Sequence, residues 1–374
     1  MIAFQPTEDE AAFIDVAVSL AADKLRPIAR TCEQHKEVAA NLTQEAAELG
    51  FLSLEMTEDW DGLELSLISQ AQIWKALSYG DLGIVQGFSG AGDAASFLRL
   101  IPDNTLLASY KPSITNGATV AWIDIQEEIQ SDLTIENNCL NGISKPVRLA
   151  KDAQYVMITT TDAAEEPIVL WLDKDLCNWQ VKDGDYRLGL LASGLARLHF
   201  DNVQISNNNI VAKGEQAVDL IKQASTRIRI LQAAKEVGLM EAALDYATEY
   251  TAGRKAFGQE IAKFQGVSFR IATMAMEARA ANHLVWQAAL AVDDGDANAA
   301  GYAIRALYRA HRSVRYVTDS AVQMLGGHGF VQDFPVEKWM RDAQAQVALY
   351  GRERDLLGRR GEQLIGPGKE VSVN

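Results

Sequence analysis

The sequence predicts a mixed α+β protein in which a β segment lies between two helical segments. Over 1–107 and 213–374, apolar residues recur mostly every three or four positions, which is the spacing of helices. Over 108–212 the pattern changes to short apolar runs separated by Asp, Asn and Gly clusters, which is typical of strands and turns. With 374 residues, of which 48% are hydrophobic, the chain can form two or three domains with sizeable cores.

The N-terminal segment is expected to contain several short helices. A capping box of Thr7 and Glu10 would begin the first one, and Pro27 would interrupt it. Further helices are predicted at about 42–49 and from Leu67 onward. This segment is therefore interpreted as a helical domain.

The middle segment is expected to be built from short strands. The stretch 138–142, Asn-Cys-Leu-Asn-Gly, is predicted to be a hairpin turn because Asn and Gly favour turn conformations. Strands are predicted at 118–120, 155–159, 168–172 and 198–200.

The C-terminal segment is predicted to be a four-helix bundle joined by short turns. A stripe of arginines at helical spacing suggests either a solvated face or a subunit contact. Its members are Arg305, Arg309, Arg312 and Arg315. The four helices are expected near 215–252, 262–292, 297–325 and 333–349.

Charge and cysteine usage exclude several function classes. A formal net charge of -15 and a pI near 4.9 argue against a nucleic-acid binder. The three cysteines are widely spaced, so neither a disulfide framework nor a metal motif is predicted. No signal segment and no long apolar run is apparent. We therefore expect a cytoplasmic protein that binds no metal, nucleic acid or membrane.

One corner between two helices carries a suggestive set of side chains. The long helix that starts near 215 is expected to stop at Gly258, and the next one to open near Gln265. Arg254, Phe257 and Gln265 would then lie together. A cation, an aromatic ring and an amide in one place suit a ligand with a phosphate, a flat ring and a hydrogen-bonding group. An arginine that merely caps helix carbonyls is the plainer alternative.

Four segments in the C-terminal half resemble the acyl-CoA dehydrogenase family in sequence, order and approximate separation. They are Arg254–Gln259 with Phe264–Gln265, Gln323–Phe330, Phe334–Lys338 and Met340–Ala343. The resemblance implies an acyl-CoA dehydrogenase-like α+β fold with an N-terminal helical domain (1–107), a middle β-barrel or sandwich domain (108–212) and a C-terminal four-helix bundle (213–374). It also implies FAD as cofactor. In that family the corner residues and the Q-x-x-G-G segment lie along the FAD of a neighbouring subunit. The implied cofactor contacts are Arg254, Phe257, Gln265, Gln323, Gly326 and Gly327.

Two family landmarks are missing from the middle segment. The loop that cradles the flavin is a Thr-Glu-Pro and Gly-Ser-Asp signature, but here Trp122 to Gln126 take that place. The family's flavin-side tryptophan is absent after Lys145, where Pro146 follows and has no N–H to donate. We therefore expect this chain's own middle domain to bind no FAD.

The family's catalytic glutamate is also missing at both of its usual places. Alignment puts Tyr350 or Gly351 at the commoner place and Ile228 at the other, so no catalytic residue is assigned. Glu353 is the nearest substitute, and Tyr350 could act as a base only with a strongly lowered pKa. Arg229 matches an arginine that borders the family's acyl site and is the candidate substrate contact.

The lost features would serve this subunit's own reaction, whereas the retained ones would complete a partner's FAD site. The sequence therefore predicts a non-catalytic subunit of a heteromeric, α2β2 FAD-dependent acyl-CoA dehydrogenase. The catalytic partner would hold the acyl-CoA and the base, and some such assemblies act on steroid side-chain CoA esters. The alternatives are a homo-oligomeric dehydrogenase with a displaced base and a non-enzymatic binding or scaffold protein.

Overall fold

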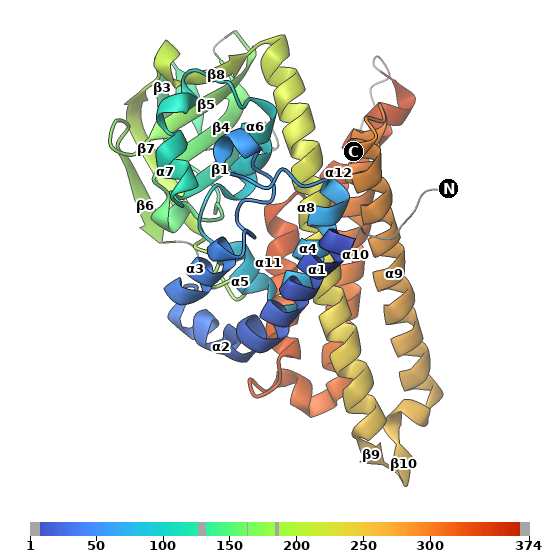
Figure 1. Cartoon of the computed structure of the whole chain (residues 1–374). Coiled ribbons are helices and arrows are strands. Elements are labelled where there is room, and N and C mark those ends of the chain that lie inside the picture. Colours follow the sequence, from blue (N-terminus) through green and yellow to red (C-terminus); the bar gives the residue numbers. More distant parts are fainter. Residues whose placement is uncertain (1–7, 126–131, 163, 184–186, 367–374) are drawn as a thin grey trace.

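The computed structural model describes residues 8–125, 132–162, 164–183 and 187–366. Figure 1 shows a β domain at one end of a long, largely buried helix, with the N-terminal helices packed against that helix midway. Further long helices lie along it to form the bundle. The predicted fold, with helical, sheet and helical parts in that order, is confirmed.

The N-terminal part is helical from residue 8 onward. The predicted interruption is displaced, because Pro27 sits in the first turn of α2, where a missing N–H has no cost. The break is a π-helical turn, Ala21–Leu25, just before it. Thr7 of the expected capping box lies outside the described residues. The helices are α1 (Glu8–Leu20), α2 (Arg26–His35), α3 (Ala40–Glu48), α4 (Leu67–Gly80), α5 (Leu82–Gly87), α6 (Ala95–Leu100) and α7 (Lys111–Thr115).

The middle part is a sandwich of two four-stranded sheets. One sheet has the order β1-β4-β5-β8 and the other β2-β3-β7-β6, and only the β1–β4 pair is parallel among these strands. Leu140 and Phe200 from one sheet pack with Val156 and Leu170 from the other, so the core lies between the sheets. The strands are β1 (Val120–Asp124), β2 (Thr134–Glu136), β3 (Cys139–Ile143), β4 (Tyr155–Thr161), β5 (Pro167–Asp173), β6 (Trp179–Asp183), β7 (Ala196–Gln204) and β8 (Ile210–Lys213).

The hairpin turn expected at 138–142 lies earlier in the chain. Asn137 and Asn138 have φ of 50° and 60°, and they form the two-residue connection between β2 and β3. Two left-handed residues suit the twist of a hairpin, and Asn tolerates that conformation. Cys139 to Gly142 therefore belong to strand β3 rather than to the turn.

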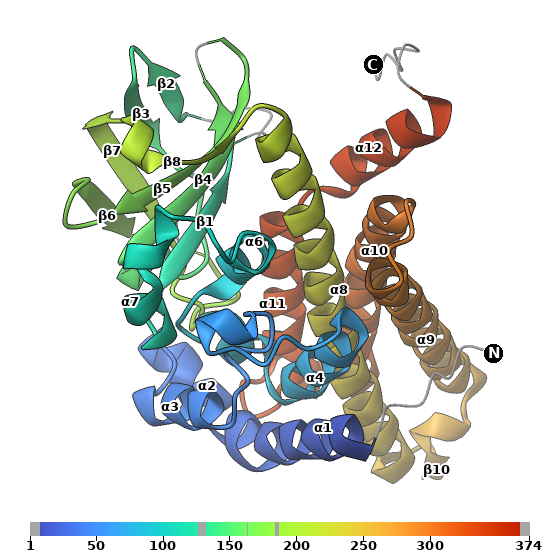
Figure 2. The same cartoon turned by 45° about the horizontal axis from the view of Figure 1, so that its top comes forward.

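The C-terminal bundle is organised around α8, and its four predicted helices are present. Close packing of α8 on α4 requires a glycine, because a Cβ atom at Gly238 would lie 2.1 Å from the carbonyl oxygen of Lys75. The turned view shows α12 at one end of the bundle, beside α10 (Figure 2). The helices are α8 (Glu215–Gly253), α9 (Gln265–Asp293), α10 (Ala299–Leu325), α11 (Val336–Leu349) and α12 (Glu353–Ile365).

The long helix ends at Gly253, in agreement with the expected range 215–252 and five residues before the stop signal considered at Gly258. Arg254 is extended, and a small hairpin follows, made of β9 (Lys255–Ala256) and β10 (Gln259–Glu260). Phe257 and Gly258 form its turn with φ of 52° and 84°. Gly258 is therefore a turn residue at the tip of the molecule, and Gly253 is the last residue of α8 (Figure 1).

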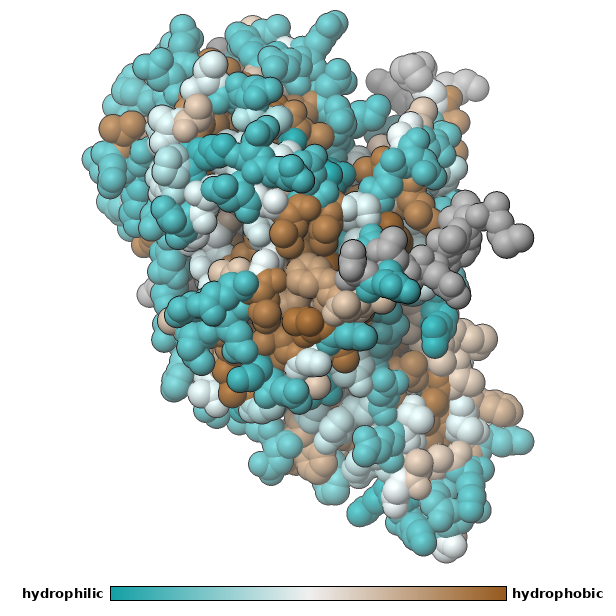
Figure 3. All heavy atoms as spheres, viewed as in Figure 1, coloured by the Kyte–Doolittle hydropathy of each residue, from teal (hydrophilic) through white to brown (hydrophobic). Residues whose placement is uncertain are grey.

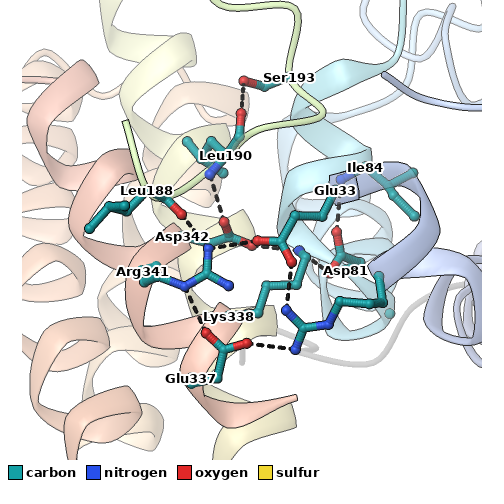
Figure 4. Close-up of polar contacts among 12 residues, drawn as sticks. Glu33, Asp81, Ile84, Leu188, Leu190, Ser193, Glu337, Lys338, Arg341 and Asp342 are labelled. Carbon is teal, nitrogen blue, oxygen red and sulfur yellow. Dashed lines mark hydrogen bonds and ion pairs between the residues drawn. The ribbon is translucent and has the colours of Figure 1, made fainter. Parts of the chain in front are cut away.

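A buried ionic cluster joins α11 to the N-terminal helices and to the middle domain (Figure 4). The Lys338 amine lies 2.6 Å from a carboxylate oxygen of Asp81 and 2.7 Å from one of Asp342. Asp342 also accepts the N–H of Leu190 at 2.6 Å. Arg341 contacts Glu33 of α2 at 2.6 Å and Glu337 at 2.7 Å. The Met-Arg-Asp-Ala segment thus holds three parts of the fold together.

Each arginine of the α10 stripe has at least one side-chain partner within the described part of the chain. Its last member, Arg315, pairs with Glu353 at the start of α12. The others contact neighbouring side chains: Arg305 with Gln287, Arg309 with Glu277, and Arg312 with Tyr308.

The surface, the helices and the cysteines add three simple observations. Apolar residues gather in the middle of the face seen in Figure 3. None of the helices in the described ranges has a segment that is both long and apolar enough to cross a bilayer. Cys32, Cys139 and Cys177 are free thiols.

Candidate functional site

The residues of the predicted corner project into solvent at the tip of the bundle. The Phe257 side chain is 95% exposed and meets Phe264 edge-on, with ring centroids 6.2 Å apart. The Arg254 guanidinium is exposed and has no ion pair or hydrogen bond with any residue that the structure describes. Gln265, the first residue of α9, is exposed too. A non-glycine residue with positive φ that displays a bare ring is unusual, and such strain often marks a functional position.

The Q-x-x-G-G segment lies at the same end of the bundle as the corner. Gln323 is in the last turn of α10, and Gly326 and Gly327 begin a 3-10 turn that runs to Phe330. The hydroxyl of Tyr250, in the last turn of α8, lies 2.8 Å from Nδ1 of His328 and so ties this turn to α8. A Cβ atom at either glycine would have no atom within 4 Å, so another molecule can approach this backbone closely.

A cavity of about 530 Å³ lies between the sandwich, α8 and the end of α11. It is lined by all four positions considered from the sequence for the base and the substrate contact, namely Ile228, Arg229, Tyr350 and Gly351. From the sandwich side it is lined by Trp122, Ile123, Asp124, Lys145, Pro146, Val147 and Arg148, and elsewhere by Asp93, Ser225, Ala348, Leu349, Arg352 and Asp355. The fold thus brings together the parts of the chain at which the reaction centre was expected.

A buried ion pair occupies the inner end of this cavity. Arg148 Nη2 and Nε lie 3.1 and 3.3 Å from the two carboxylate oxygens of Asp93, and the two side chains are 8% and 13% exposed. The Tyr350 hydroxyl donates to Asp93 Oδ2 at 2.8 Å, and the Gln232 amide donates to Oδ1 at 2.8 Å. Arg148 also donates to the carbonyl of Gln86 at 3.1 Å. Elements from all three parts of the fold therefore converge on one carboxylate.

The electrostatics of this pair fix the protonation states. Burial alone would raise the pKa of Asp93, but Arg148, Lys235 and the Tyr350 hydroxyl hold it below its usual value. Burial, together with the adjacent carboxylate of Asp93, raises the pKa of Tyr350 well above 10. Tyr350 is therefore a permanent hydrogen-bond donor. The possibility that it serves as a base is excluded, since that role requires a lowered pKa.

Family comparisons match both helical parts of the chain. Residues 7–103 match the acyl-CoA dehydrogenase N-terminal domain, and residues 218–356 match the acyl-CoA dehydrogenase C-terminal domain. The chain belongs to the acyl-CoA dehydrogenase family.

Individual relatives agree with this assignment. The chain is 26% identical to the mitochondrial isobutyryl-CoA dehydrogenase of Dictyostelium discoideum over 361 residues. The aligned region covers 93% of this chain and 87% of that protein. Over 197 residues it is 32% identical to the probable acyl-CoA dehydrogenase FadE25 of Mycobacterium tuberculosis (strain ATCC 25618 / H37Rv), covering 52% of this chain and 51% of the relative.

Solved structures share the fold at lower sequence identity. Butyryl-CoA dehydrogenase from Megasphaera elsdenii superposes with a TM-score of 0.86 at 23% identity, over 98% of this chain and 100% of that one. A structure described as PigA with FAD and proline superposes with a TM-score of 0.88 at 18% identity, over the same shares. At these identities the likeness establishes the architecture.

The tip of this acyl-CoA dehydrogenase chain fits part of an FAD molecule. An exposed guanidinium is a good partner for a diphosphate, an exposed ring suits stacking, and open glycine backbone allows close approach. Arg254, Phe257, Gln265, Gln323, Gly326 and Gly327 supply these features and are exposed. Arg254 also lines a hollow of about 410 Å³ together with Tyr246, Glu249, Tyr250 and Gly253.

The chain's own sandwich face does not fit a flavin ring. In the segment at the place of the family's flavin-cradling loop, Trp122 to Asp124 belong to strand β1, and the Ile125 N–H donates to the carbonyl of Thr159 at 2.9 Å. Gln126 lies outside the described residues. At the second landmark, the Val147 N–H is used by Ala196 at 2.8 Å, and Pro146 has none. The N–H groups of Ile125 and Val147 are therefore already used, and Pro146 has none to offer.

Carboxylates near the cavity are all engaged. Asp93 holds Arg148, Asp124 accepts the Thr159 hydroxyl at 2.9 Å, and Asp355 pairs with Arg352 at 2.8 Å. Glu353, the substitute base considered from the sequence, is bound to Arg315 and is not among the described residues that line the cavity. A displaced base at Glu353 has no support in this geometry.

The polar residues behind the ion pair were not identified from the sequence. Gln86 donates to Gln232 at 2.6 Å and to Gln346 at 2.7 Å, and the Lys235 amine lies 3.3 Å from Gln86 Oε1. The same amine lies over the ring of Trp74, 4.7 Å from its centroid. Burial, aided by Arg148, lowers the pKa of Lys235 to about 7. The available signal was a Gln and a Lys at helical spacing within the apolar stretch of α8.

Proposed function

We propose that this chain is the non-catalytic subunit of a heteromeric FAD-dependent acyl-CoA dehydrogenase, most simply an α2β2 assembly. Its tip would contribute Arg254, Phe257 and the Q-x-x-G-G backbone to an FAD held mainly by a catalytic partner. Its own cavity would carry out no dehydrogenation. Bound FAD would supply the hydride acceptor in the partner's site.

The observation that carries the proposal is the contrast between the two regions of this one chain. At the tip, Phe257 is almost fully exposed and Arg254 has no described partner, so both are available to a second molecule. In the cavity, Tyr350, which with Gly351 is one of the two positions aligned with the family's base, has a raised pKa, and the neighbouring carboxylates are occupied. A subunit that donates groups but performs no reaction would have this distribution.

Each tip residue has a definable task in this proposal. The Arg254 guanidinium would pair with the FAD diphosphate, and the Phe257 ring would cover a flat part of the cofactor. Gln265 and Gln323 would offer amide hydrogen bonds, and Gly326 and Gly327 would let the backbone approach. The acyl-CoA would bind in the partner's site, with a steroid side-chain CoA ester as one substrate class to test. Three free thiols fit the cytoplasmic location included in this proposal.

The test is coexpression with dehydrogenase-like chains encoded nearby, followed by measurement of flavin per chain. A yellow complex with fewer flavins than subunits is expected, whereas this chain alone should be colourless. Arg254→Ala should weaken FAD retention by about 10- to 100-fold, which is the value of a charge-assisted contact. Phe257→Ala should weaken it by about 10-fold.

Lys263→Ala provides the matched control, because this exposed cation lies on the same corner and already pairs with Glu260 at 2.5 Å. It should leave the flavin content unchanged. A chain that is yellow alone and is reduced by an acyl-CoA would refute the proposal. A complex that contains no flavin would instead support the scaffold alternative.

A further inference from the structure

The cavity between the sandwich, α8 and the end of α11 has the size and the walls of a small-molecule site. Its volume of about 530 Å³ lies within the range of about 300 to 1,000 Å³ that such sites usually have. Removing hydrocarbon from water against an apolar wall is favourable, so the cavity suits the apolar part of a ligand. The apolar side chains that line it include Trp122, Ile123, Val147, Ile228, Ala348 and Leu349.

The charged residues that line this cavity differ in burial, and this difference distinguishes its mouth from its inner end. Lys145 is exposed, and the side chain of Arg352 is 64% exposed. The side chains of Arg148 and Asp93 are only 8% and 13% exposed. Because a charged group on a ligand stays hydrated only where water reaches it, an acidic head group would remain at the mouth. The apolar part of the ligand would then extend toward the buried pair.

At the inner end, the Asp93 carboxylate has no capacity left for a ligand. Its Oδ1 faces Nη2 of Arg148 and accepts the Gln232 amide, and its Oδ2 accepts Nε of Arg148 and the Tyr350 hydroxyl. A carboxylate has about four lone-pair sites, so these four contacts occupy them all. A hydroxyl or amine on a ligand could therefore not donate to Asp93.

Arg148, in contrast, keeps hydrogen-bond donors to spare. A guanidinium has five N–H groups. Within the described part of the chain, the contacts with Asp93 and with the Gln86 carbonyl use three of them. The inner end of the cavity therefore presents donors from a cation whose charge Asp93 already balances.

These properties select one kind of ligand group. A ketone or another neutral carbonyl accepts hydrogen bonds and donates none, so it matches the inner end. A methyl group there would leave an Arg148 N–H without water and without a partner, which is costly for a charged donor. A second carboxylate would be buried beside Asp93 without a counter-charge of its own.

We propose that this cavity is a binding site for an apolar molecule with an acidic head group at one end and a neutral carbonyl at the other, and that Arg148 selects the carbonyl. The ligand is bound without being converted. This inference goes beyond the proposed function, because it concerns a ligand of this chain alone and involves neither a flavin nor a partner.

The first experiment titrates the full-length chain with 9-oxodecanoate, decanoate and decanedioate by calorimetry. These acids share the head group and the chain length, and they differ only at the far end. The keto acid should bind about 10-fold more tightly than either of the others, which is the value of a hydrogen bond to a charged donor. Binding of decanoate as tight as that of the keto acid, or no binding of any of the three, would overturn the proposal.

The second experiment removes the donors of the inner end. Asp93→Asn combined with Arg148→Met eliminates both charges at similar volume, so decanoate should now bind at least as tightly as 9-oxodecanoate. Arg352→Ala is the matched control at the mouth. It should weaken the binding of the two acids to a similar extent and leave their ratio unchanged.

Arg148→Lys covers the case in which the double variant does not fold, which circular dichroism will show. A lysine keeps the charge but has three donors instead of five, so the preference for the keto acid should fall. A preference equal to that of the wild type in either folded variant would show that Arg148 does not select the carbonyl. Flavin takes no part in these measurements, so their failure is distinguishable from failure of the subunit proposal.

Discussion

Replacing Lys338 by Met should destabilise the protein strongly. This amine is 5% exposed and is shared by two carboxylates, Asp81 and Asp342, whose side chains are 1% and 0% exposed. Methionine preserves most of the volume, so the main loss is electrostatic. Removing one partner from a buried ion pair costs about 3 to 5 kcal/mol. At an unfolding entropy of about 2.1 cal/mol/K per residue, this corresponds to a fall of about 4 to 6 °C in the midpoint.

The stability lost in the Lys338→Met variant should depend on pH in a defined direction. Burial already raises the pKa of Asp342, and Lys338 opposes that rise. Without Lys338 the pKa of Asp342 rises further above its unfolded value, so the folded variant binds more protons than the unfolded chain. Its stability therefore increases as pH falls, and the deficit should be smaller at pH 5 than at pH 8.

The assay is thermal unfolding followed by circular dichroism over that pH range. Lys213→Met is the matched control, because Lys213 also contacts two carboxylates, on Asp162 and Glu166, but is 48% exposed. It should shift the midpoint by less than about 1 °C. If Lys338→Met behaved like Lys213→Met, or if its deficit grew at low pH, the ionic cluster would not be what holds α11 in place.

Two further predictions test packing and the buried amine. Gly238→Ala should lower the free energy of unfolding in urea by about 1 to 3 kcal/mol, because its Cβ would meet the Lys75 carbonyl. Gly253→Ala is the control and should be neutral or slightly stabilising, because its Cβ would have no atom within 4 Å. The folded pKa of Lys235, about 7, lies below its unfolded value. The free energy of unfolding of the wild type should therefore rise by about 2 to 3 kcal/mol between pH 7 and pH 9. The Lys235→Met variant should lack this rise. If the free energy of unfolding of the two proteins depended on pH in the same way, Lys235 would not be a buried lysine with a lowered pKa.

Sequence patterns located most elements because they depend on local periodicity. The four bundle helices, the sandwich strands and the start of α9 at Gln265 follow from spacing and from turn residues. The errors are local as well. The hairpin turn lies at Asn137–Asn138, because several Asn and Gly residues in that stretch could have adopted positive φ. Only the packed chain selects among them.

Family motifs led to the cavity residues Ile228, Arg229 and Tyr350, but they did not reveal what those residues do there. The partner of Tyr350 is Asp93, 257 positions earlier in the chain, and Arg148 reaches the same carboxylate from the sandwich. No periodicity links residues so far apart. Likewise, the Arg-Asp of the Met-Arg-Asp-Ala segment proved to be an anchor for α2, α5 and the middle domain.

The sequence by itself determined the family, the order of the domains and the identity of the tip residues, because these depend on short stretches of chain. Only the tertiary structure decided which charges are paired, which side chains remain exposed and which residues line each cavity. The physical reason is that burial sets the strength of an ion pair and the pKa of an acid or a base, and burial is a property of the whole fold.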